Sequence, residues 1–233
     1  MRTGVDAAQS AILDLAYFAG KLPMEGEMIA FSRLEVAHIN ITSGRIIAAD
    51  SLVPLTTSVP FTVVAPQGKF PVVLSLTHID GHDRVAYAVI EFSSRQPASW
   101  EMAVPEGHSL AELDKGTTFG FPVDSWHAGF LDADAASAWG EGSATTLKEE
   151  HEAHDGLWNE HEFVGTQANM VTFFSGYGSG RYACYFGRGP QGEIVSLVAD
   201  FRILVDLEMY REVKKRSLAR AEGARRNLRE EGA

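Results

Sequence analysis

Four side chains of this 233-residue sequence could together carry out acid–base or nucleophilic chemistry. Asp124 and His127 lie close together in a loop-like stretch, where a carboxylate can orient an imidazole that acts as a base or binds a metal ion. Ser175 places a hydroxyl beside a run of glycines. Asp200 lies in an apolar, strand-like run, where a carboxylate needs a partner or must face a cleft. A hydrolase or lyase would use these four residues as catalytic groups.

Structural roles are the alternatives for this first group. Asp124 could satisfy the backbone of a turn, because aspartate often bonds to nearby amides. Asp132 precedes an alanine-rich stretch and is placed to cap a helix there. Trp126 could form the wall of a pocket or belong to the core. Asp200 could be a buried, paired acid.

The most unusual stretch is a glycine-rich loop between two aromatic runs, FSGYGSGRY at 174–182. It lacks the spacing of a dinucleotide fingerprint, and a strand rather than a helix is expected after it, so it predicts no dipole-backed phosphate site. It also differs from a nucleophile elbow. A hairpin loop that needs positive φ is one interpretation. The other is a binding loop whose ligand contacts are Gly176, Tyr177, Gly178 and Tyr182.

Histidines elsewhere offer weaker metal-binding patterns. His151 and His154 would share a helix face, which permits a divalent metal, but their spacing is one residue short of the metalloprotease pattern. Their acidic surroundings also fit a solvated insertion at about 137–162. His78 and His82 lie near acidic residues at an expected hairpin tip, where a polar turn is the alternative.

The elements expected to position these residues are mostly strands. Short apolar runs recur with turn residues between them, which predicts a mainly β fold, an antiparallel sandwich or open barrel. The expected hairpins pair strands around 42–44 and around 80–83. Helices are expected at 5–18, capped by Asp6, after Asp132, and at the C-terminus. We predict one domain over 1–205 and a charged C-terminal helix or tail over 206–233.

Composition narrows the function classes. The formal net charge of −11 disfavours nucleic acid and favours cationic partners. Cys184 is the only cysteine, and it lies in an apolar run that predicts a buried, unreactive thiol. No run reaches the roughly 18 apolar residues of a membrane span. We therefore expect a soluble, cytoplasmic protein whose partner is a small molecule or protein, with the terminal helices as a possible homo-oligomer contact.

The order of motifs over residues 34–204 resembles a bacterial family known as domain of unknown function 4241. The matching segments are TSGRIIAAD (42–50), PQGKFPV (66–72), RVAYA (84–88), WEMA (100–103), FGFPVD (119–124), FLDAD (130–134), FSGYGSGRY (174–182) and VADF (198–201). The resemblance implies no activity. It also implies Gly-Asp-Gly where this chain has Gly178-Ser179-Gly180. Function is therefore predicted from the residues: a binding module that uses the loop 174–182, or alternatively the hydrolase or lyase above.

Overall fold

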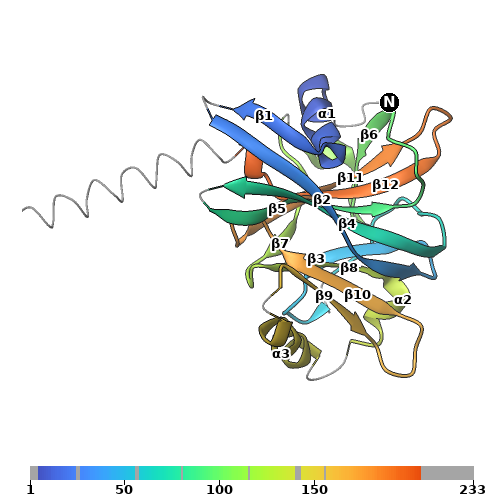
Figure 1. Cartoon of the computed structure of the whole chain (residues 1–233). Helices are drawn as coiled ribbons and strands as arrows, with labels where there is room; N and C mark the ends of the chain where they lie inside the picture. Colours follow the sequence, from blue (N-terminus) through green and yellow to red (C-terminus); the bar gives the residue numbers. More distant parts are fainter. Residues whose placement is uncertain are drawn as a thin grey trace, which may run out of the picture.

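The computed structural model describes residues 5–24, 27–55, 58–79, 81–114, 116–139, 143–154 and 156–205. Within these ranges, twelve strands form two antiparallel sheets that face each other (Figure 1). The sheets are not closed into a barrel, so the predicted mainly β fold is confirmed in its sandwich form. The predicted C-terminal helix over 206–233 lies outside the described residues.

The five longest of the described strands all belong to the large sheet, whereas the strands of the small sheet have five or six residues. In spatial order, the large sheet contains β1 (Gly20–Met24), β2 (Glu27–Ile41), β4 (Gly68–Ile79), β5 (His82–Glu91), β12 (Ile194–Asp200), β11 (Gly180–Arg188) and β6 (Ser99–Met102), with β7 (Phe121–Val123) also paired to β11. The small sheet contains β3 (Ile46–Asp50), β8 (His127–Asp132), β10 (Asn169–Phe174) and β9 (Trp158–Glu162). As a result, β2, which has 15 residues, extends well past the strands of the small sheet, which have five or six residues.

Three apolar clusters hold these layers together. The main core lies between the sheets and includes Phe130 and Phe173 from the small sheet and Phe186 from the large sheet. A second cluster covers the outer face of the large sheet, and a third covers the outer face of the small sheet. The central strands are apolar on both faces for this reason, as the sequence of β5 predicts.

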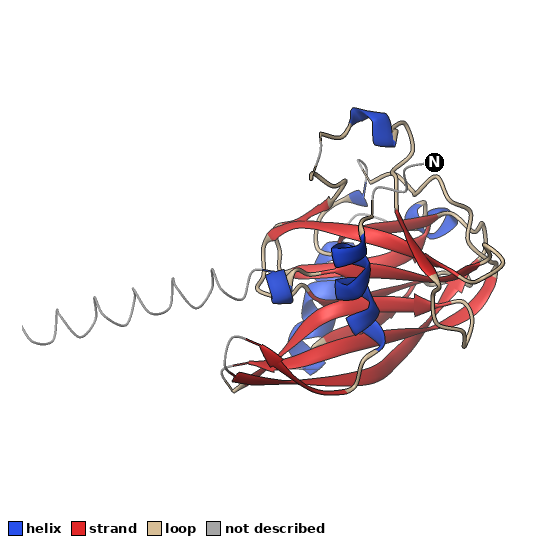
Figure 2. Ribbon diagram, turned by 90° about the horizontal axis from the view of Figure 1, so that it is seen from above, coloured by secondary structure: helices blue, strands red, loops and turns tan. Residues whose placement is uncertain are grey.

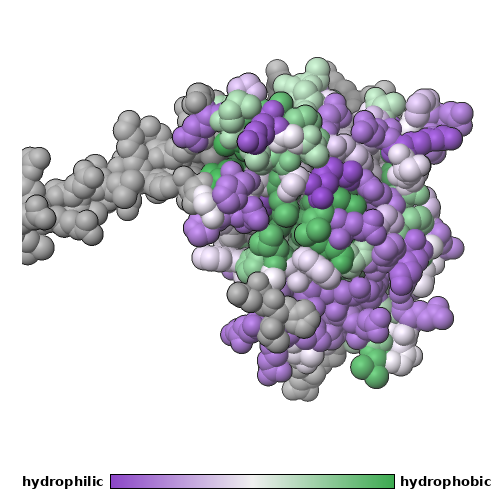
Figure 3. Space-filling model, viewed as in Figure 1, coloured by the Kyte–Doolittle hydropathy of each residue, from purple (hydrophilic) through white to green (hydrophobic). Residues whose placement is uncertain are grey.

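Helices cover both outer faces. The helix α1 (Ala7–Asp14) and the 3₁₀ turn η1 (Leu15–Tyr17) lie on the large sheet, as Figure 2 shows. The predicted caps are confirmed, since Asp6 accepts the Gln9 N–H at 2.9 Å and Asp132 caps α2 (Ala133–Ala136). A further 3₁₀ turn, η3 (Leu110–Glu112), lies between β6 and β7. None of the described helices has the length and apolar character of a membrane span. Hydrophilic residues cover much of the face seen in Figure 3, with apolar areas among them.

The segment at 137–162 contributes to the fold. It contains α3 (Ser143–His154), whose Leu147 is fully buried against the small sheet, and β9, which pairs with β10. Its acidic residues conceal this role in the sequence, because only a few apolar side chains face the sheet.

The hairpin predictions have mixed outcomes. The hairpin between β4 and β5 is confirmed. The predicted hairpin around 42–44 is wrong, because β2 pairs with β1 and β4 whereas β3 pairs with β8 in the other sheet. The glycine loop is likewise not a hairpin turn, since β10 belongs to the small sheet and β11 to the large one. Both segments carry the chain from one sheet to the other.

Alkaline pH is expected to destabilise the protein through Tyr17. Burial raises the pKa of Tyr17 from 10 to about 12. The unfolded chain therefore loses this proton at lower pH than the folded chain, so stability is complete below pH 10 and falls as pH rises towards 12. Two pKa units correspond to about 2.7 kcal/mol.

Urea unfolding of the wild type and of Tyr17→Phe between pH 9 and 12 measures this effect. Burial also raises the pKa values of Tyr87 and Tyr185, so the stability of both proteins falls with pH. We expect the variant to show a slope smaller by about one proton. Equal slopes in the two proteins would contradict the role given to Tyr17.

Candidate functional site

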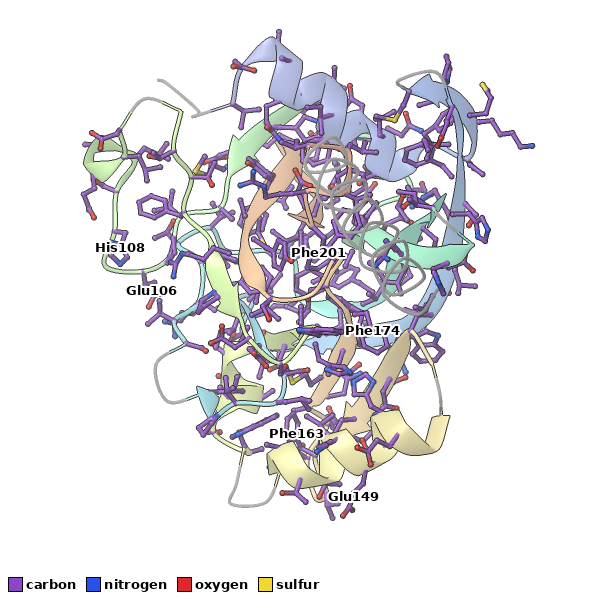
Figure 4. The ribbon with its side chains drawn as sticks, turned by 90° about the vertical axis from the view of Figure 1, so that its left-hand side faces the viewer. Glu106, His108, Glu149, Phe163, Phe174 and Phe201 are labelled. Atoms are coloured by element: carbon purple, nitrogen blue, oxygen red, sulfur yellow. The ribbon has the colours of Figure 1, made fainter. Side chains whose placement is uncertain are left out.

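A cleft opens at the end of the sandwich where the long strands extend past the small sheet. At this end of the small sheet β10 finishes at Phe174, opposite the first residue of β8, His127, and near the start of β9. The β4–β5 turn of the large sheet lies at the same end, because the start of β5 and Phe174 line one cleft. Figure 4 views the molecule from this side, with Phe174 and Phe201 near the middle of the view.

The cleft has a volume of about 330 Å³ and aromatic and apolar walls. Its lining comes from the start of β5, the loop before β8, the residue before β9 and the glycine loop. The lining residues are His82, Asp83, Arg84, Val85, Trp126, Leu157, Phe174, Ser175, Gly176, Tyr177 and Gly178. Three of the four predicted ligand contacts, Gly176, Tyr177 and Gly178, therefore lie at one cleft, together with Ser175.

A buried carboxylate, Asp50, builds the loop that carries Trp126. Asp50 is the last residue of β3 and is 4% exposed. Its Oδ2 accepts the backbone N–H groups of Asp124 at 2.7 Å and of Ser125 at 2.8 Å. Its Oδ1 accepts the Ser125 hydroxyl and the Leu52 N–H. Bonds from several donors to one carboxylate fix the turn, because hydrogen bonds to charged groups are stronger than neutral ones.

Trp126 stands at the tip of this turn in an unusual conformation. Its φ is 71°, and its side chain is 57% exposed. A bulky residue in the left-handed region costs about 1–3 kcal/mol and persists only where its surroundings impose it. The indole lies on Gly178, where a Cβ would come within 3.1 Å of the ring. Glycine at 178 therefore allows the tryptophan to lie flat against the loop.

The hydroxyl of Ser175 holds the glycine loop to the tryptophan turn. It donates to the carbonyl oxygens of Trp126 at 3.1 Å and Gly178 at 2.8 Å. The Ser175 N–H also donates to the Trp126 carbonyl, at 3.0 Å. Gly176 and Gly178 have φ values of 54° and 117°, which confirms the expected positive φ in this loop.

A cation already lies against one aromatic ring of the cleft. The Arg84 guanidinium carbon is 4.7 Å from the ring centroid of Tyr177. Asp83, the next lining residue, forms an ion pair with His78 at 2.9 Å on the protein surface. The β4–β5 turn therefore brings both charge signs to the edge of an aromatic cleft.

Two histidines, His127 and His151, lie next to Phe174. The His127 ring is 4.5 Å from the ring of Phe174 and 4.4 Å from the ring of His151, between centroids. His127 Nδ1 hydrogen-bonds the carbonyl of Ser125 at 2.8 Å, and His151 Nε2 hydrogen-bonds the hydroxyl of Thr172. The described part of the chain contains no group of three or more His, Cys, Asp or Glu side chains placed to hold a metal. The side chain of His154 lies outside the described residues.

The other predicted residues lie apart from the cleft lining. Asp124 is exposed, and its carbonyl accepts the Ser179 hydroxyl at 3.0 Å. Asp200 is 5% exposed and faces α1, where Gln9 Nε2 is 3.4 Å from it. Tyr182 donates its hydroxyl to the Gly178 carbonyl at 2.7 Å and lines a different hollow with Asp50. No hydrogen bond joins His127 to Ser175 in the described structure, and the catalytic roles stay predictions.

Cys184 has the buried environment that its sequence predicts. It is 2% exposed, and burial raises the pKa of its thiol well above the usual value. The thiol is therefore in its protonated, poorly nucleophilic form at neutral pH.

Sequence reasoning missed the part played by Asp50. In the sequence Asp50 is only the end of an apolar run, because the turn residues that donate to it, Asp124 and Ser125, lie 74 and 75 residues further along the chain. Trp126 was considered for a pocket wall, and its exposure supports that alternative over a place in the core. An aspartate at the end of an apolar strand is the only local feature that could have pointed to Asp50.

Comparison with known proteins gives a family and no activity. The searches of curated proteins and of solved structures each returned no match. The model of a family described as "Protein of unknown function (DUF4241)" matches residues 39–199, a span that contains the glycine loop, Trp126 and Asp50. Since this match covers more than half of the chain, the protein belongs to the DUF4241 family.

Proposed function

We propose that this protein is a binding module and that its site is the cleft between the glycine loop and the β4–β5 turn. The observation that carries the proposal is Trp126, an exposed aromatic side chain held at φ 71° by a buried hydrogen-bond network. Strained residues concentrate at functional sites, where the surrounding structure imposes the geometry. A large aromatic ring that stays exposed in a preformed turn offers contact area at little ordering cost.

The lining supports a small-molecule ligand or a short segment of a partner. A cleft of about 330 Å³ lies at the lower end of the range for small-molecule sites. Its apolar walls provide affinity, while the charged residues at its edge provide orientation. The hydrolase or lyase alternative stays a prediction on Asp124, His127, Ser175 and Asp200. Asp124 is exposed, whereas Asp200 is buried beside α1.

Replacement of Trp126 by glycine is expected to abolish binding without unfolding the protein. Glycine adopts positive φ readily, so relief of strain offsets the lost packing, and the free energy of unfolding should stay within about 1 kcal/mol of wild type. The probes are a panel of aromatic and alicyclic fragments with neutral, anionic and cationic members, followed by saturation-transfer NMR. We expect fragments that bind the wild type to lose at least about tenfold in affinity, equivalent to 1.4 kcal/mol.

The matched control is Val164→Ala, which shortens a fully exposed apolar side chain outside the cleft lining. Its fragment binding should equal that of the wild type. The proposal is wrong if no fragment binds the wild type, or if every binder tolerates Trp126→Gly.

A further inference from the structure

The aromatic rings that line the cleft are suited to a positively charged ligand. Trp126, Phe174 and Tyr177 all line it, and the face of an aromatic ring carries the negative part of its quadrupole. Tryptophan attracts cations most strongly among these side chains, and the attraction grows when the cation is removed from water. The 57% exposure of Trp126 leaves indole surface available to a ligand.

The chain itself shows that a cation is accepted at this cleft. Arg84 places its guanidinium 4.7 Å from the centroid of Tyr177, within the usual limit of about 6 Å for a cation–π contact. This contact also directs the positive charge of Arg84 towards Tyr177. The remaining aromatic walls, Trp126 and Phe174, have no cation over them in the described structure.

The overall charge of the chain favours a cation, and at short range the Asp83 carboxylate offsets the charge of Arg84 in the cleft lining. Asp83 lines the cleft, and its carboxylate is 57% exposed and forms an ion pair with His78. Residues 1–205 contain 25 acidic and 12 basic side chains, while residues 206–233 contain 6 and 8. The domain that contains the cleft is thus more acidic than the whole chain, and such a field raises the local concentration of cations.

The lining also distinguishes organic cations from metal ions. Calcium and magnesium need several oxygen ligands, and the described residues contain no group of three or more candidate acidic, histidine or cysteine ligands. Leu157 and Phe174 add apolar wall instead. Alkyl groups around a charged nitrogen would bury against such walls, whereas a hydrated metal ion would lose its water without replacement.

We infer that the cleft binds an alkylated ammonium group, with its charge over the Trp126 indole and its alkyl substituents against the apolar walls. Asp83 lies at the edge as a counter-charge. This inference rests on the proposed function, because it names the ligand class of the same cleft.

The test compares two molecules of nearly equal shape and different charge. Choline carries a trimethylammonium group, and 3,3-dimethyl-1-butanol carries a tert-butyl group in its place. Isothermal titration of the full chain at constant ionic strength should give at least about tenfold tighter binding of choline, since a desolvated cation–π contact favours only the charged ligand. Potassium chloride in place of choline should give no saturable signal.

Variants show where choline binds and separate the contribution of Trp126 from that of Asp83. Trp126→Gly should abolish choline binding, and Trp126→Phe should weaken it about three- to tenfold because the phenyl ring attracts cations less. Asp83→Asn should weaken choline binding and leave 3,3-dimethyl-1-butanol binding unchanged. The exposed pair of Asp83 with His78 contributes little to folding, so this variant should keep the wild-type stability.

Three results would overturn the inference: equal or tighter binding of the neutral alcohol, choline binding that survives Trp126→Gly, or no choline binding at all. The fragment panel keeps these failures distinct from failure of the proposed function. Neutral or anionic fragments that depend on Trp126 would leave the binding module in place and exclude only its preference for ammonium groups.

Discussion

Asp50→Asn is expected to lower the free energy of unfolding by about 3 kcal/mol, because it replaces a buried charged acceptor of several hydrogen bonds. The carboxylate accepts backbone N–H groups of Leu52, Asp124 and Ser125 and the Ser125 hydroxyl. Asparagine would turn an NH₂ group towards some of these donors and leave them unsatisfied. Urea unfolding at pH 7 measures the loss.

A second readout separates loss of the Trp126 turn from a general loss of stability. Asp132→Asn is the matched control, because Asp132 is also buried and its carboxylate accepts several bonds, including those from Ser43 and Asp134. Both variants should be destabilised, but only Asp50→Asn should change acrylamide quenching of the exposed tryptophan and weaken fragment binding. A loss below about 1 kcal/mol for Asp50→Asn would show that the network does not hold the turn.

Gly176→Ala is the second change with a large expected effect, a loss of about 2–4 kcal/mol. At φ 54° a side chain is already unfavourable. In addition, the new Cβ would lie 2.9 Å from both the Cβ and the carbonyl oxygen of Phe201. Backbone of a buried residue cannot move away cheaply, so the loop between the sheets would have to shift. Thermal and urea unfolding of the variant measure the effect.

Gly192→Ala separates the steric part of this loss from the conformational part. Gly192 also has positive φ, at 83°, but a Cβ there meets no atom within 4 Å. This control should lose only about 1 kcal/mol, from conformation alone. Equal losses at the two positions would show that contact with Phe201 adds nothing.

The strands were predictable where their apolar pattern is local. Val85, Val89 and their neighbours mark β5 as central, and the Asp-Gly turn before it marks the hairpin with β4. The partner of β10 was not predictable in the same way. A glycine loop between two aromatic strands looks alike in sequence whether the strands pair with each other or belong to opposite sheets, because pairing is decided by the packing of whole sheets.

The candidate site was predictable only in part, for a related reason. The glycine-rich composition of the loop is enough to predict a role for Gly176, Tyr177 and Gly178, and these residues do line the cleft. Asp50 holds the Trp126 turn and Arg84 lines the cleft from segments far away in the chain, so no spacing rule connects them with the loop. The turn that holds Trp126 at positive φ is fixed by the distant carboxylate of Asp50. The residues next to Trp126 therefore do not predict its conformation.

The four crossings between the sheets in the described chain also affect how the chain assembles. The chain passes from the large sheet to the small one after β2, returns after β3, passes again after β7 and returns after β10, so each sheet is built from segments that are separated in sequence. The last two strands of the large sheet, β11 and β12, follow all four strands of the small sheet in the chain. Folding therefore depends on many distant contacts forming together, which is the pattern of slow, all-or-none β folders. In such a molecule the cleft exists only in the fully assembled state, because its walls come from both sheets.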